Sequence, residues 1–132
     1  MQRLAPATAE RLLLGLTAAL TALAAFAPAV PLPAHYHHFA DQRALAGLPF
    51  AMDVLTNLPF ALAGAWGLAA LRRASLMPPQ RGLAALFFIG LLLTALCSGI
   101  YHLNPANAGL ALDRTGMAVA FVGIVGLAAA IA

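Results

Sequence analysis

The sequence predicts an all-α integral membrane protein, a helical bundle with four transmembrane helices. Of its 132 residues, 63% are hydrophobic and only 8% are charged, which is far too apolar for a soluble domain of this length. Four apolar stretches approach or exceed the roughly 20 residues that cross a bilayer. Because none of them shows the alternation of barrel strands, helices are the expected way to satisfy the backbone in lipid.

We expect these spans to form one membrane domain over residues 1–132. Their expected positions are residues 12–30, 54–71, 83–103 and 110–132. The first span has a second interpretation as a signal peptide, because basic Arg3 and Arg11 precede an apolar core that ends in small residues at 27–29.

The arginines predict the orientation in the membrane. The seven cations are all arginine in a chain rich in Ala, Leu and Gly, which indicates a GC-rich bacterial genome. For an apolar helical bundle from a bacterium we expect a location in the inner membrane. Arg72, Arg73 and Arg81 lie between the second and third spans. Since cytoplasmic loops carry an excess of arginine, we expect this loop and the N-terminus to be cytoplasmic. The polar loop of residues 31–53 and the turn at 104–109 then share the other side.

The small net charge argues against nucleic-acid binding, and the single cysteine excludes an internal disulfide. A net charge of +3 comes from a few loop arginines, not from the basic stripe of a nucleic-acid-binding domain. We therefore expect no nucleic-acid partner. Cys97 is the only cysteine, so no internal disulfide forms, and within an apolar helix it is expected to be a small buried residue.

Three polar residues mark the junction of the third and fourth spans. Ser98 and His102 are four residues apart, so they share one face of a helix, and Asp113 follows across a break rich in Pro, Asn and Gly. Ionisable groups are costly at membrane depth and are candidates for a functional site there. The alternatives are an interfacial histidine bonded to the turn and an aspartate that favours a helix dipole. A Ser-His-Asp triad is disfavoured because Ser98 lacks the strand–turn–helix setting of such a nucleophile.

Two further polar residues begin the second span. Asp53 can be a helix N-cap or part of a polar site. Asn57, just before Pro59, can bind a ligand or satisfy the backbone that the proline leaves unpaired.

The loop of residues 31–53 contains a group of histidines. His37 and Asp41 are four residues apart, and His35 and His38 are close by. Clustered histidines can bind a metal, and the alternative is a solvated interfacial loop with Tyr36 as an aromatic anchor. His37, Asp41, Asp53 and Asn57 are therefore candidates for a secondary polar or metal site.

The motif Ser98-x3-His102-x10-Asp113, within SGIYHLNP and LDRTGM, resembles the alkaline ceramidase family. That family belongs to a wider group of seven-helix membrane hydrolases that includes the progestin and adiponectin receptors. The segments YHHFADQR (36–43) and DVLTNLPFALAG (53–64) also resemble bacterial ceramidase-like membrane proteins. The likeness covers residues 36–117, most of the chain.

The resemblance implies a zinc-dependent hydrolase that cleaves the amide bond of N-acyl sphingoid-type lipids, with a membrane lipid as substrate. It implies that His102 is a zinc ligand and that Ser98 and Asp113 are catalytic residues beside the metal. A catalytic zinc with three protein ligands has an open position for a water that ionises near neutral pH.

The sequence also departs from the family pattern. The family's other two zinc histidines form a His-x3-His on its last helix, and this sequence has neither that pair nor seven spans. We therefore expect a partial seven-helix fold, either the N-terminal part of a longer protein or a truncated form, that binds zinc weakly. In isolation it is expected to be inactive unless the loop histidines or a partner supply the missing ligands. The alternative function is that of a non-enzymatic structural or binding subunit in the membrane.

Overall fold

The computed structural model describes residues 6–28 and 30–131, which form helices and connecting segments. The all-α class predicted from the sequence is confirmed. Contacts divide the chain into two units, Met1–Ala34 and His35–Ala132. Among the described residues, three helical stretches are long and apolar enough to cross a membrane: Ala51–Leu71, Pro78–Leu103 and Asn107–Ile131. The predictions that involve Arg3, Ala29 and Ala132 fall outside the described residues.

The first unit contains helix α1, Pro6–Phe26. This helix covers most of the first predicted span. Its apolar stretch, Leu14–Leu23, is shorter than the three helical stretches that are long enough to cross a membrane. The helix ends before the predicted limit because Pro28 cannot continue the backbone pattern and disfavours helical geometry at the residue before it.

The second predicted span consists of two helices, α2 (Ala51–Leu55) and α3 (Leu58–Leu71), with a break between them. Pro59 lies in the first turn of α3, where its missing N–H is tolerated. The Asn57 side chain donates a 2.9 Å hydrogen bond to the Asp53 carbonyl, and the Thr56 hydroxyl donates to the same oxygen at 3.1 Å. These side chains satisfy backbone that the break would leave unpaired, as the structural interpretation of Asn57 anticipates.

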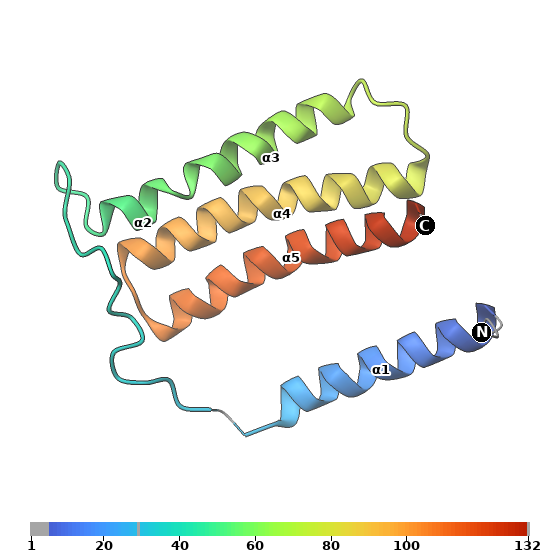
Figure 1. Cartoon of the computed structure of the whole chain (residues 1–132), viewed down its shortest axis with the longest axis horizontal. Coiled ribbons are helices and arrows are strands. Elements are labelled where there is room, and N and C mark those ends of the chain that lie inside the picture. The colour runs from blue at the N-terminus through green and yellow to red at the C-terminus, as the bar shows by residue number, and fades with distance from the viewer. Residues whose placement is uncertain (1–5, 29, 132) are drawn as a thin grey trace. The chain divides into compact units, whose positions relative to one another are not determined.

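Helices α4 (Pro78–Leu103) and α5 (Asn107–Ile131) form a long antiparallel hairpin. In Figure 1, α4 lies between α3 and α5 and contacts both. Small residues allow the close approach: a methyl group added at Gly90 would lie 2.3 Å from the Ala120 nitrogen, and one added at Gly123 would lie 2.3 Å from the Phe87 nitrogen. Such contacts hold membrane helices together where the hydrophobic effect between helices is absent.

Candidate functional site

The register of α5 on α4 determines which polar residues meet. A methyl carbon added at Gly109 would lie 3.1 Å from Cδ2 of Tyr101, and one added at Gly116 would lie 3.0 Å from Cα of Thr94. Asp113 lies four residues after the first glycine and three before the second, so it shares their face. Asp113 therefore faces the stretch of α4 between these two contacts.

That stretch of α4 contains Ser98. Ser98 and Asp113 are both buried, each with 8% of its surface exposed. The hydrogen bonds formed among the described residues include neither side chain. A buried hydroxyl and carboxylate in an apolar bundle need a polar partner. The register thus brings two of the three predicted residues to one level of the hairpin, with both side chains able to bind a ligand or water.

His102 lies one turn beyond Ser98 and is half-buried. Its ring packs against Phe39, with 4.6 Å between the ring centroids, and against Tyr101 at 5.1 Å. His102 Nδ1 and Asp53 Oδ2 are side-chain atoms with essentially no exposed surface and no hydrogen-bond partner among the described residues. Buried polar atoms are nearly always paired in native proteins, so both are further positions for a ligand or water.

His37, in the loop before α2, links that loop to the end of the hairpin where α4 ends and α5 begins. Its Nε2 lies 2.8 Å from Oδ1 of Asn107, and its Nδ1 lies 2.9 Å from the Tyr101 hydroxyl. Since the carboxamide oxygen only accepts, Nε2 donates to it, and in the neutral ring Nδ1 then accepts from the tyrosine. Arg114 also donates a 2.6 Å hydrogen bond to the Tyr36 hydroxyl. The loop therefore covers the end of the bundle where Ser98, His102 and Asp113 lie.

Tyr101, Asn107 and Phe39 belong to this end of the bundle, and the sequence analysis did not single them out. The bonds of His37 join residues 64 and 70 positions apart. No local pattern encodes contacts at such a separation. The sequence gives one clue to their role, which is that they neighbour the predicted site. Tyr101 directly precedes the candidate residue His102, and Asn107 is the first residue of the helix that follows.

Of the four residues proposed for a secondary site, Asp53 and Asn57 are joined by a hydrogen bond from the Asn57 side chain to the Asp53 backbone carbonyl. The side chains of His37 and Asp41 bond to other residues. Asp41 pairs with Arg43 at 2.8 Å, and the hydrogen bond from the Arg43 side chain holds the pKa of the Asp41 carboxyl below its ordinary value. The described residues contain no group of three His, Cys, Asp or Glu side chains placed to hold a metal ion.

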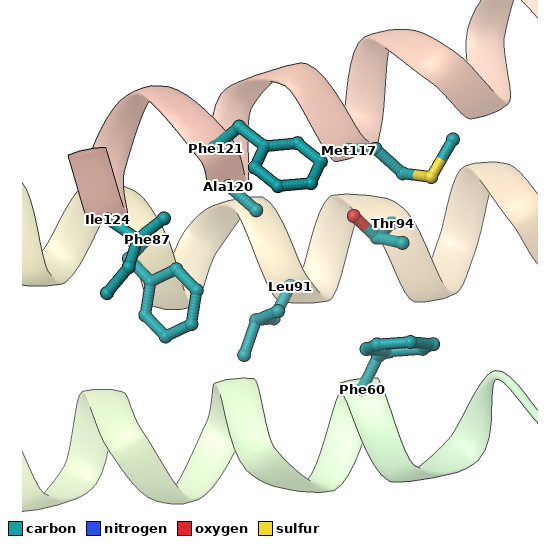
Figure 2. Close-up of a pocket in the computed structure, with 8 residues that line it drawn as sticks. All are labelled: Phe60, Phe87, Leu91, Thr94, Met117, Ala120, Phe121 and Ile124. Atoms are coloured by element: carbon teal, nitrogen blue, oxygen red, sulfur yellow. The ribbon is translucent and has the colours of Figure 1, made fainter.

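An apolar groove of about 250 Å³ lies along α4 between α3 and α5. Figure 2 shows Phe60 reaching it from α3, Leu91 and Thr94 from α4, and Met117 and Phe121 from α5. This volume is small for a ligand pocket, which suits a hydrocarbon chain better than a large ring system.

Buried polar residues lie close to the groove along each of the three chain segments that form it. Three residues that line the groove each have a buried polar residue about one helical turn away along the chain. In all three cases the polar residue lies toward the end of the bundle where α4 ends and α5 begins. These pairs are Asn57 and Phe60, Ser98 and Thr94, and Asp113 and Met117. An amphiphilic ligand could therefore place an apolar chain in the groove and a polar group beside Ser98 and Asp113.

Comparison of the chain with protein-family models, with curated proteins and with solved structures finds no match. The relation to alkaline ceramidases is therefore a hypothesis that rests on the sequence motifs.

Proposed function

We propose that this protein is a ceramidase-like membrane hydrolase of N-acyl sphingoid-type lipids and that its described residues form the part of the site that binds the amide. The observation that supports this proposal is an apolar groove whose lining residues Thr94 and Met117 each lie about one helical turn from buried Ser98 and Asp113. A lipid amide has the matching shape, with a hydrocarbon chain next to a group that both donates and accepts hydrogen bonds.

In this proposal the acyl chain lies along Leu91 and Met117 and the amide lies one turn further on. The Ser98 hydroxyl donates to the amide carbonyl oxygen. The Asp113 carboxylate accepts from the amide N–H, or from a water beside the carbonyl carbon. Each hydrogen bond to the charged carboxylate contributes about 1.5–3 kcal/mol, and the surrounding apolar side chains exclude the competing water.

The zinc ion that the resemblance implies does not fit these residues alone. His102 Nδ1 is buried and unpaired among the described residues, as a ligand atom would be. A catalytic zinc has three protein ligands, and the described residues do not gather three. Hydrolysis through zinc would therefore need ligands beyond this set, and the roles of Ser98 and Asp113 above do not depend on the metal.

The second candidate is a non-enzymatic membrane subunit that binds an amide lipid without cleaving it. In both cases we propose a bacterial inner membrane location with a cytoplasmic N-terminus, because of the arginine distribution.

A photoreactive N-acyl sphingoid lipid tests the binding site in nanodiscs that contain the full chain. Saturable labelling is expected for the unchanged protein. Asp113→Asn should weaken it roughly tenfold or more, because a charge-assisted hydrogen bond is lost. Asp41→Asn is the matched control, since it makes the same substitution at a carboxylate paired to Arg43 in the loop, and it should leave labelling unchanged.

Two results would contradict the proposal: no saturable labelling of the unchanged protein, or equal labelling of both variants. Release of free fatty acid in the presence of added zinc distinguishes the hydrolase from the non-enzymatic subunit.

A further inference from the structure

The opposite end of the α3–α4 pair carries exposed arginines beside an exposed tryptophan. Arg72 and Arg73 directly follow α3 and are exposed. Trp66 lies one and a half turns earlier and has 79% of its surface exposed. These three residues, with Ala69 and Ala70, line a hollow of about 320 Å³. The two alanine methyl groups leave the space between the indole and the guanidinium groups open.

A third arginine keeps the polypeptide next to this hollow in place. Arg81, in the first turns of α4, donates hydrogen bonds to the carbonyl oxygens of Leu71 and Ala74. Its guanidinium therefore caps the end of α3 and fixes the connection to α4. Arg72 and Arg73 are left as the cations that face outward.

These two arginines and the aspartate side chains of their unit lie at opposite ends of the helices. In the unit His35–Ala132 the carboxylates are Asp41, Asp53 and Asp113. The first pairs with Arg43, and the other two lie in α2 and near the start of α5, at the opposite end of the helices. Within the described residues of this unit, Arg72 and Arg73 have no salt-bridge partner.

The depth of the hollow fits the boundary between lipid tails and headgroups. The apolar stretch of this span ends at Leu71. Trp66 lies five residues inside that end, which is roughly 7–8 Å at the rise of an α-helix. Tryptophan favours this level because its ring is amphipathic, and arginine side chains extend from it toward the headgroups.

We propose that Trp66, Arg72 and Arg73 bind the headgroup of an anionic phospholipid. Two guanidinium groups can hold the phosphodiester oxygens, which arginine matches in bidentate geometry. The start of an acyl chain can lie over Ala69 and Ala70 against the indole. A zwitterionic lipid presents the same phosphate with an ammonium group that offsets its charge, so the site selects lipids with a net negative charge. The inference is independent of the function proposed above.

The single tryptophan makes the site directly observable, because Trp66 is the only one in the chain. The test uses the full chain in vesicles of phosphatidylglycerol and phosphatidylcholine at a fixed ratio, with brominated acyl chains on one lipid at a time. Bromine quenches indole fluorescence on contact. We expect brominated phosphatidylglycerol to quench Trp66 several-fold more effectively than brominated phosphatidylcholine, and added salt to reduce the difference. Equal quenching by the two lipids would overturn the proposal.

Variants assign the selectivity to the arginines. Replacing both arginines, Arg72→Gln with Arg73→Gln, should abolish the selectivity, since each cation near an anionic surface changes lipid affinity roughly fivefold. Arg72→Lys with Arg73→Lys keeps the charge that orients the protein and should retain only part of the selectivity. Arg43→Gln, at an exposed arginine in the loop near the other end of the helices, is the control and should change nothing. Selectivity that survives the double glutamine substitution would overturn the proposal.

Discussion

Tyr101 is the residue on which the polar end of the bundle depends. Only 4% of its surface is exposed, its hydroxyl bonds to His37, and its ring packs against Phe39. Gly109 of α5 approaches it so closely that an added methyl would lie 3.1 Å from the ring. One side chain thus joins α4, α5 and the preceding loop.

The first prediction concerns the link between His37 and this tyrosine. His37→Ala removes two side-chain hydrogen bonds and leaves the buried Tyr101 hydroxyl unpaired, so we expect the free energy of unfolding in mixed micelles to fall by about 1–3 kcal/mol. Hydrogen exchange in residues 36–50 should become faster. His35→Ala, at an exposed neighbour, is the matched control with an expected effect below about 0.5 kcal/mol. Equal effects of the two substitutions would show that the link contributes nothing.

The second prediction concerns His102 as a metal ligand. Because catalytic zinc takes three protein ligands and His102 supplies one, we expect the purified chain to retain far less than one zinc per molecule. Metal analysis in detergent measures this directly. Stoichiometric zinc that disappears in His102→Ala would show that the chain already holds a complete site at His102. Stoichiometric zinc that survives this substitution would assign the metal to the loop histidines.

At the scale of the helices, glycine and alanine determine how α4 and α5 pack. Gly90, Gly116 and Gly123 each meet backbone atoms of the opposite helix, at distances where a side chain has no room. The same close packing sets the register that places Asp113 beside the turn of Ser98. The hairpin that stabilises the fold therefore also positions the proposed site.

The third prediction tests this packing. Gly123→Ala would place a methyl carbon 2.3 Å from the Phe87 nitrogen, and backbone cannot turn aside as a flexible side chain can. We expect the helices to separate and the free energy of unfolding to fall by about 1–3 kcal/mol. Gly99→Ala is the control, since nothing lies within 4 Å of its added methyl and alanine favours the helix by about 1 kcal/mol. Unfolding in mixed micelles measures both, and a loss of stability of similar size in the two variants would contradict the packing argument.

At the scale of the whole molecule, the sequence predicts the helical class and the C-terminal ends of the second and third spans, at Leu71 and Leu103, because apolar composition is a local signal. Pro59 similarly indicates the break that Asn57 bridges. The aromatic cover of Phe39 over His102 could not be predicted, because it depends on how a long loop returns to the helices. The groove was also missed, since it depends on the spacing of α3 and α5 across α4 and not on any one segment.

The last prediction concerns the orientation of the α4 helix across the membrane. Ser75 and Ala106 flank α4, whose 26 residues span about 39 Å at the rise of an α-helix, more than the roughly 30 Å of a hydrocarbon core. In a Cys97→Ala background, we expect Ser75→Cys to react only with a reagent applied from the cytoplasmic side and Ala106→Cys only from the other side. The reason is the excess of arginine around Ser75. Both positions are exposed, so failure to label is not expected from burial. Labelling of both from one side would contradict a membrane-spanning α4, and the reverse assignment would place the Arg72 and Arg73 headgroup site in the outer leaflet.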